Sequence, residues 1–314
     1  MGKWLVIARR VVQLVAFIAI TAALVSAQLA VPGLSAWLER VQFLPAVLAS
    51  AMFVFVSWLI ITLVFGRIYC STVCPIATVN DAASRLHRCS RKQAERHRYT
   101  YTPAAWRTRY IILAAALVSL MTGFFLFPSL IDPYAVWVRF CRDCISWALS
   151  TSGIQSAPLT PGSYEYSSVT IITGTIAGAA VSAITIATLW IVAARRGRLV
   201  CNTVCPIGTT LGLISRYSIM QIDIDTDRCT QCRRCVDVCK SQCIDIVSHT
   251  VDASRCVNCF DCLRACSDDA IHYTARRKQL SEPMMQKVAK LQSHTGAPLT
   301  GTNTTIHKST TEKP

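Results

Sequence analysis

The chain has 314 residues, of which 52% are hydrophobic and only 16% are charged, and its formal net charge is +15. This composition is typical of a membrane protein. The positive charge does not indicate nucleic-acid binding, because the basic residues lie beside long apolar runs and no recognition motif accompanies them. The chain shows no phosphate-cradling glycine loop, dinucleotide fingerprint or nucleophile–base triad, so nothing in it supports a hydrolase or a kinase.

Four apolar runs are each long enough for the roughly 20 residues that a helix needs to cross a bilayer. They cover residues 11–31, 45–65, 110–130 and 168–194. The first run is too long for the apolar region of a signal peptide, and Val31-Pro32-Gly33 is a poor cleavage site. The sequence therefore predicts four transmembrane helices.

A motif is repeated after the second and the fourth run. The segments are GRIYCSTVCP at residues 66–75 and GRLVCNTVCP at residues 197–206, 131 positions later. Two-span units that repeat in one orientation predict a pseudo-twofold axis along the membrane normal. In each motif the cysteines lie at i and i+4, and the proline suits the first position of a new helix. We expect four thiols to meet near the axis, those of Cys70, Cys74, Cys201 and Cys205.

Four converging thiolates can hold an iron–sulfur cluster or a soft metal such as copper(I). The start of a helix lowers the pKa of a nearby thiol, and so does a guanidinium group. We therefore expect Arg67 and Arg198, which precede the cysteines, to favour anionic sulfur. The alternative is that each motif holds a buried pair of structural cysteines.

The basic residues predict the orientation of the spans. Nine of them lie between Arg67 and Arg109, and three more follow the fourth run, whereas the two other links hold only three. By the positive-inside rule both termini and both repeated motifs are then cytoplasmic. The excess charge also favours contact with anionic membrane lipid.

The link between the third and fourth runs contains a lone C-x2-C, formed by Cys141 and Cys144. On the oxidising side of the membrane such a pair can be a reversible redox pair or a structural disulfide. The sequence leaves both alternatives open.

Eight further cysteines form two copies of C-x2-C-x2-C-x3-C, the spacing that binds two [4Fe-4S] clusters. Three closely spaced thiolates hold one cubane, and the fourth reaches the other cluster. The predicted ligands are Cys229, Cys232, Cys235 and Cys266 for cluster 1, and Cys256, Cys259, Cys262 and Cys239 for cluster 2. Two zinc ribbons are the alternative, but zinc sites use separate C-x2-C pairs rather than unbroken runs of four.

The ferredoxin-like segment is itself duplicated, with its second half 27 residues after the first. Cys243 stands where the second half has Ala270, so it is either a small packed side chain or an accessory redox group. The residue after the fourth cysteine, usually Pro, is Lys240 in one half and Ser267 in the other. This change removes stiffness from the loop but no ligand.

These patterns predict an α-helical membrane protein with four transmembrane helices, arranged as two repeated two-helix units, and a C-terminal α+β ferredoxin domain of the bacterial 2[4Fe-4S] type. The expected bounds are residues 1–217 for the transmembrane domain, 218–276 for the ferredoxin domain and 277–314 for a basic, polar tail that is partly disordered.

With four spans, two CxxxCP motifs and a ferredoxin that ends CSDDAIHY, residues 5–275 resemble the membrane polyferredoxins of the NapH/MauN type. The membrane halves of the NosR and CcoG families are related to this group. The resemblance implies a multi-pass protein of the bacterial inner membrane that transfers electrons between the quinone pool, or a cytoplasmic donor, and a redox partner protein. It implies an electron-transfer subunit of an oxidoreductase, such as a quinol dehydrogenase. CKSQCID departs from the usual CPxxA pattern, which leaves the subfamily open.

Two other functions remain open. One is a copper reductase or assembly factor, in which the CxxxCP thiols bind copper. The other is an iron–sulfur redox sensor that regulates a partner.

Overall fold

The structure is a computed structural model. It describes residues 2–28, 52–89, 99–124, 126–151 and 176–275. The chain divides after Arg276 into two units, and the first holds every described residue. The predicted tail at 277–314 lies outside the described residues, and so do parts of the four predicted spans.

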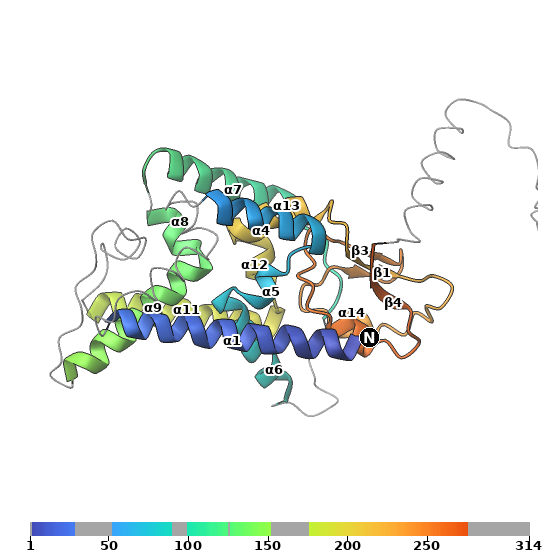
Figure 1. Cartoon of the computed structure of the whole chain (residues 1–314), viewed down its shortest axis with the longest axis horizontal. Helices are drawn as coiled ribbons and strands as arrows, with labels where there is room; N and C mark the ends of the chain where they lie inside the picture. Colours follow the sequence, from blue (N-terminus) through green and yellow to red (C-terminus); the bar gives the residue numbers. More distant parts are fainter. Residues whose placement is uncertain (1, 29–51, 90–98, 125, 152–175, 276–314) are drawn as a thin grey trace, which may run out of the picture. The chain divides into compact units, whose positions relative to one another are not determined.

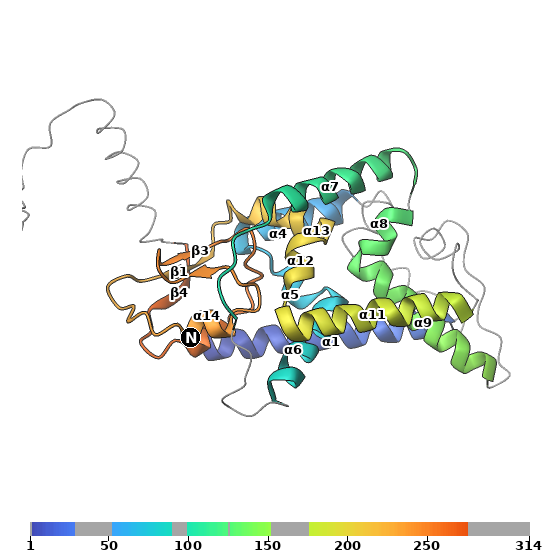
Figure 2. The same ribbon diagram turned by 180° about the vertical axis from the view of Figure 1, so that it is seen from behind.

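The chain before residue 218 is helical, as Figures 1 and 2 show from opposite sides. Its longer helices are α1 (Gly2–Gln28), α4 (Met52–Phe65), α6 (Pro75–Cys89), α7 (Trp106–Met121), α9 (Pro133–Thr151) and α11 (Ile176–Arg196). Its shorter helices are α5 (Tyr69–Thr72), α8 (Leu126–Ile131), α12 (Leu199–Thr203) and α13 (Pro206–Ser215).

The helices contact one another as two equivalent sets. α6 follows the first CxxxCP motif and packs against α1 of its own repeat and α11 of the other. α13, its counterpart, packs against α7 of its own repeat and α4 of the other. This reciprocal exchange of partners is what a pseudo-twofold arrangement of two repeats requires.

By length and composition alone, one helix in the described ranges could cross a membrane, the segment Gly2–Leu24 of α1. The apolar helical segments Phe53–Phe65 and Pro206–Ser215 are shorter. Helix length and composition therefore support one span, in α1.

The third predicted span, residues 110–130, does not have the predicted bounds. α7 ends at Met121, and Gly123 follows in the left-handed region with φ 75° before α8 begins. The next helix, α9, fills part of the link between the third and fourth predicted spans. Asp132 accepts a hydrogen bond from the Ala135 amide at 2.8 Å, and Pro133 takes the first helical position. A carboxylate cap followed by proline starts a helix in this way.

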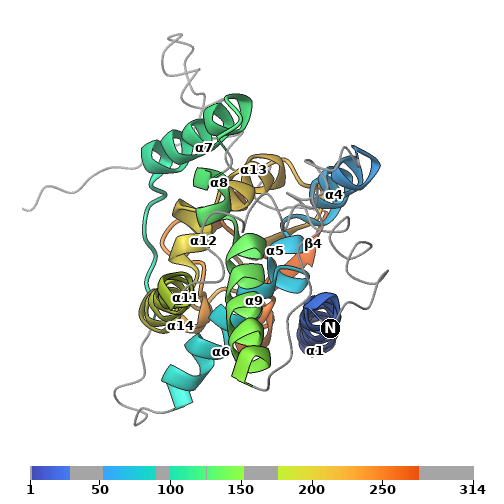
Figure 3. The same cartoon turned by 90° about the vertical axis from the view of Figure 1, so that its left-hand side faces the viewer.

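α9 lies at the centre of the helical part, between α1 and α11 (Figure 3). Ala135 and Val138 on α9 are 0% and 1% exposed. Because α9 buries its side chains against neighbours on several sides, it forms a core element rather than an outer loop.

Two glycines end the helices that precede the CxxxCP motifs. Gly66 follows α4 with φ 75°, and Gly197 follows α11 with φ 63°. A Cβ at Gly66 would lie 2.5 Å from Asn258 Nδ2, and one at Gly197 would lie 2.5 Å from the Lys240 carbonyl oxygen. Both positions therefore need glycine for the backbone conformation and for close packing against the ferredoxin loops.

The ferredoxin part consists of two short antiparallel sheets and two one-turn helices. β1 (Gln221–Ile224) pairs with β4 (Ile271–Thr274), and β2 (Ile244–Asp245) pairs with β3 (Thr250–Val251). The helices are α14 (Arg234–Val238) and α15 (Asp261–Ala265). The duplication extends to the backbone, because non-glycine residues with positive φ recur 27 positions apart. They are Gln231 and Asn258, Arg233 and Phe260, and Gln242 and Asp269.

We predict that Gly197→Ala lowers the thermal unfolding midpoint of the detergent-solubilised protein more than Gly123→Ala does. Both glycines have positive φ, which penalises alanine by roughly 1 kcal/mol. At Gly197 the new Cβ also meets the Lys240 backbone, whereas at Gly123 nothing lies within 4 Å. Equal midpoints for the two variants would show that the packing of Gly197 against the ferredoxin loop is unimportant.

Candidate functional site

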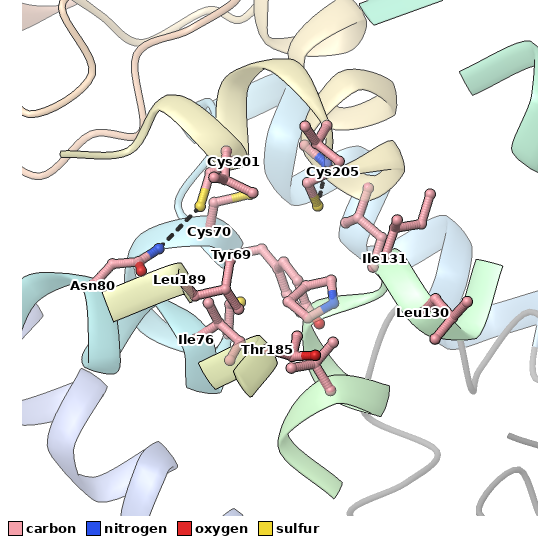
Figure 4. Close-up of a pocket in the computed structure, with 17 residues that line it drawn as sticks. Tyr69, Cys70, Ile76, Asn80, Leu130, Ile131, Thr185, Leu189, Cys201 and Cys205 are labelled. Carbon is pink, nitrogen blue, oxygen red and sulfur yellow. Dashed lines mark hydrogen bonds between the residues drawn. The ribbon is translucent and has the colours of Figure 1, made fainter. Parts of the chain in front are cut away.

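The thiols of both CxxxCP motifs line one cavity of about 130 Å³ (Figure 4). α5 and α12 contribute Cys70 and Cys201, whereas Cys74 and Cys205 come directly before the prolines that start α6 and α13. The structure therefore brings the four cysteines together at one cavity, as expected. What they bind stays a prediction.

The other walls of the cavity are mainly apolar. Leu130 and Ile131 of α8, Val136 of α9 and Leu189 of α11 lie opposite the two motifs. One water molecule needs on the order of 10–15 Å³, so this cavity has room for a group larger than one ion. Four thiols therefore lie together in a mainly apolar cavity among the helices.

Two fully buried arginines join the two repeats. Arg67 of the first repeat donates from Nη2 to the carbonyl oxygen of Cys201 at 3.5 Å. Arg198 of the second repeat donates from Nη1 to the carbonyl oxygen of Cys70 at 2.5 Å. Both side chains are 0% exposed. Each repeat thus holds the first cysteine of the other, and this reciprocal pair sets the shape of the cavity.

Arg67 is surrounded by neutral acceptors. Its Nη1 donates to Asn202 Oδ1 at 3.0 Å and to the Ser254 carbonyl at 2.9 Å, and its Nη2 lies 3.8 Å from Cys70 Sγ. Within the described ranges it pairs with no carboxylate, and its buried Nε has no hydrogen-bond partner. Since an uncompensated buried charge is unfavourable, the cavity suits a group with negative charge, such as a thiolate-bound cluster.

The cavity thiols receive further hydrogen bonds. Asn80 Nδ2 donates to Cys201 Sγ, and the Gly208 amide donates to Cys205 Sγ, each at 3.3 Å. Burial nevertheless raises the pKa of Cys74, Cys201 and Cys205 above the usual thiol value. Arg198 opposes this rise at Cys201 but does not overcome it. The arginines act on the Cys201 pKa in the expected direction, but removal from water is the larger effect, so the net pKa is raised.

A buried ion network lies beside the cavity. Asp81 on α6 pairs with Arg9 at 3.1 Å, with Arg198 at 3.0 Å and with Lys240 of the ferredoxin part at 3.1 Å. Lys240 also pairs with Asp261 at 3.2 Å. The network therefore connects α1, both repeats and both halves of the ferredoxin part.

Sequence reasoning did not identify Asp81 or Asn80 as functional residues. The sequence did offer an indication, because the two repeats differ at these positions. The second repeat has Leu211 and Gly212 in the equivalent positions, 131 residues later. A polar pair that appears in one copy of a repeat only is a sign of a specific contact.

The ferredoxin thiols lie close together, and the assignment of ligands to two clusters stays a prediction. Cys229, Cys232, Cys235 and Cys266 line one small cavity. The Cys262 thiol lies within electrostatic reach of Cys259, Cys256 and Cys239 of its own predicted set, and also of Cys235 of the first set. Within the described residues no three His, Cys, Asp or Glu side chains converge closely enough for a single metal ion. A cubane binds each thiolate at a different iron, so its ligands lie further apart.

The two sets differ in exposure. Cys232 of the first set is exposed, whereas Cys239, Cys256 and Cys262 of the second are buried. The loop of the second set contacts the helices: Asn258 donates to the Phe65 carbonyl. The second set therefore lies toward the helical part, and the exposed thiol belongs to the first set.

Cys141 and Cys144 are both free thiols on α9. Cys141 is buried and Cys144 is exposed. Their i, i+3 spacing in a helix leaves Cβ atoms about 5–6 Å apart, whereas a disulfide needs about 3.5–4.5 Å. The structure thus contains no structural disulfide at this pair, and its redox role stays a prediction.

Comparisons with known proteins agree with the thiol pattern. A family model described as a 4Fe-4S binding domain matches residues 47–92 and 177–222, the segments that hold the two CxxxCP motifs. A second model of the same description matches residues 222–245. The chain contains 4Fe-4S binding domains that serve electron transport. Iron–sulfur clusters are therefore its cofactors.

The chain is similar to two proteins over parts of their length. A protein of Escherichia coli (strain K12) named "Putative electron transport protein YccM" is 24% identical over 200 residues, which cover 63% of this chain and 48% of that protein. "Uncharacterized protein MJ0749" of Methanocaldococcus jannaschii is 38% identical over 42 residues, 13% of this chain and 17% of that protein. The chain thus spans less than half the length of either relative. No solved structure matches it.

We predict that Asp81→Asn destabilises the protein by about 3–5 kcal/mol, because the buried Arg9 and Arg198 lose the carboxylate they pair with and Lys240 keeps only Asp261. Burial opposes ionisation of Asp81, but Arg198, Lys240 and Arg9 hold its pKa well below the usual value. A carboxyl group with a lowered folded-state pKa stabilises the fold above about pH 4, and the stabilisation disappears as the pH falls through that pKa.

Thermal unfolding at pH 7 and at acidic pH checks this expectation, with the exposed Asp227→Asn as control. The Asp81→Asn variant should unfold at a lower temperature than the wild type at pH 7. The difference should narrow as the pH is lowered. A constant difference at every pH would contradict the role of the ionised Asp81.

Proposed function

We propose that the chain is a membrane-bound electron-transfer protein of the NapH/MauN type. It passes electrons between the quinone pool, or a cytoplasmic donor, and a soluble redox partner protein. The observation that carries this proposal is the placement of the thiols. The arginines of the CxxxCP motifs bond to the loops of the ferredoxin part, Arg198 to the Lys240 carbonyl and Arg67 to the Ser254 carbonyl, and Cys232 of the first set is exposed.

The proposed membrane location rests on four helices, α1, α4, α7 and α11, that expose large apolar side chains. Examples are Val15 on α1, Phe53 on α4, Met121 on α7 and Ile184 on α11, which are 61%, 86%, 86% and 65% exposed. Contiguous apolar surface of this kind is unfavourable in water and suits lipid. We propose that these helices are the four spans of a multi-pass inner-membrane protein.

The direction of these helices supports the proposed topology. The start of α1 and the start of α7 lie at the ferredoxin part, through the pair Arg10–Asp261 at 3.3 Å and the bond from Arg109 to Ser254 Oγ at 3.3 Å. The end of α4 and the end of α11 lie there too. Helices α1 and α7 thus run away from the ferredoxin part, and α4 and α11 run toward it, as four alternating membrane spans would. In this topology the ferredoxin domain and the basic links lie on the same, cytoplasmic side.

The eight ferredoxin thiols are proposed to hold two [4Fe-4S] clusters in the sets described above. The four CxxxCP thiols are proposed to hold a third iron–sulfur group, for which the cavity volume and the uncompensated charge of Arg67 provide room and a favourable field. Each cluster, when bound, gives or accepts one electron at a time. Copper(I) at the CxxxCP thiols is the alternative, and it would favour a copper reductase or assembly factor.

The two halves of the ferredoxin domain differ where a partner would dock. The first half exposes Arg233 and Arg234, whereas the equivalent Phe260 and Asp261 of the second half are buried. We therefore place the soluble partner at the first half and the quinone side at the CxxxCP cavity, whose apolar walls come from α8, α9 and α11.

Quinol-driven reduction tests the proposed function. Under anaerobic conditions, a water-insoluble quinol added to the full chain in lipid vesicles should reduce the iron–sulfur signals. Copper(II) reduction with bound copper, and no response to quinol, would favour the copper reductase. Partner binding that changes with cluster state without turnover would favour a sensor.

We predict about twelve irons per chain after anaerobic purification, four for each of three thiol sets. Cys70→Ser and Cys201→Ser should each reduce this to about eight, because both thiols belong to one shared site. Cys141→Ser is the control and should keep twelve. Stoichiometric zinc with little iron would refute iron–sulfur binding, and eight irons in the wild type would refute the third group.

We also predict that reporter fusions at residue 95 and at the C-terminus are cytoplasmic, and that a fusion at residue 155 is extracytoplasmic. The basic links set this orientation. A periplasmic C-terminus would place the ferredoxin thiols in an oxidising compartment and contradict the proposed topology.

A further inference from the structure

Cys243 is a buried thiol that belongs to none of the proposed ligand sets. It is 1% exposed, and its Sγ lies 3.6 Å from Sγ of Cys239. The Cys256 thiol is also within hydrogen-bond reach. Both neighbours belong to the second set, so Cys243 is a fifth thiol beside four proposed ligands.

The internal duplication gives a direct comparison. In the second half Ala270 takes the equivalent place, and its amide donates to Cys266 Sγ at 3.3 Å. Cys239, the counterpart of Cys266, likewise receives backbone amide hydrogen bonds, including that of Cys243. The two fourth cysteines therefore share the amide donor, and only Cys239 also has a thiol neighbour at this position. The thiol is one chemical difference between the two environments, beside Lys240 in the place of Ser267 and the deeper burial of Cys239.

We propose that Cys243 is a positioning residue that donates its S–H to the ligand sulfur of Cys239, and so makes the cluster of the second set easier to reduce. This inference rests on the proposed function, because it requires a cluster in each set. A ligand thiolate has no proton to donate, so Cys243 must be the donor of the pair. Hydrogen bonds to ligand sulfur stabilise the reduced, more negative state and raise the reduction potential. The second set lies nearer the CxxxCP cavity, so the effect favours electron entry from that side.

The duplication supplies matched variants for the test. Cys243→Ala gives the second set the side chain that the first has at this position, and Ala270→Cys gives the first set a thiol at the equivalent position. The full chain in detergent is titrated redox-chemically under anaerobic conditions, with the clusters followed by electron paramagnetic resonance and with iron counted in parallel.

Cys243→Ala should lower the potential of one cluster by about 59 mV, a tenfold change in its one-electron equilibrium, and leave the iron content unchanged. Ala270→Cys should raise the potential of the other cluster. Cys243→Ser keeps a hydrogen-bond donor, so its potential should lie closer to that of the wild type than the potential of Cys243→Ala does. Unchanged potentials in Cys243→Ala would overturn the proposal, and so would loss of iron, which would make Cys243 a ligand. A wild type without iron would instead refute the proposed function itself.

Discussion

The reciprocal hydrogen bonds of Arg67 and Arg198 are the interaction on which the rest of the structure depends. Each guanidinium is fully buried and reaches the backbone of the first cysteine in the other repeat. Their Nη groups donate across the boundary between the repeats, while Nε of each arginine has no hydrogen-bond partner, so it is the Nη bonds that favour one register of the two repeats. Gly66 and Gly197 follow from this constraint, because each lets the chain turn from a helix directly into the buried arginine.

The same constraint connects the helices to the ferredoxin part. Arg67 donates to the Ser254 carbonyl, Arg198 shares Asp81 with Lys240, and Lys240 directly follows Cys239. The CxxxCP cavity and the second thiol set are therefore held by the same side chains. Cys232 of the first set lies outside this group of contacts and is exposed. The two thiol sets of the duplicated ferredoxin part therefore differ: the second is held against the helices, and the first includes an exposed thiol.

The sequence predicted the features that depend on local spacing. The helices that start at Pro75 and Pro206 follow from the position of proline after cysteine, and the 4Fe-4S domains follow from the thiol pattern. The bounds of the third apolar run could not be predicted in the same way, because hydropathy does not register a turn at Gly123 or the cap at Asp132. The Asp81 network was not predicted either, since it joins residues up to 159 positions apart. Pairing at such separation is decided by packing rather than by local pattern.

A double-mutant cycle on Arg67 and Arg198 tests the central claim most directly. Arg67→Lys, Arg198→Lys and the double variant are compared by their thermal unfolding midpoints in detergent, because lysine keeps the charge but not the forked geometry. If the two arginines hold one shared interface, each single variant should lose nearly as much stability as the double variant. Losses that add up would show that the repeats are held independently, and they would contradict the account of one site built jointly by both.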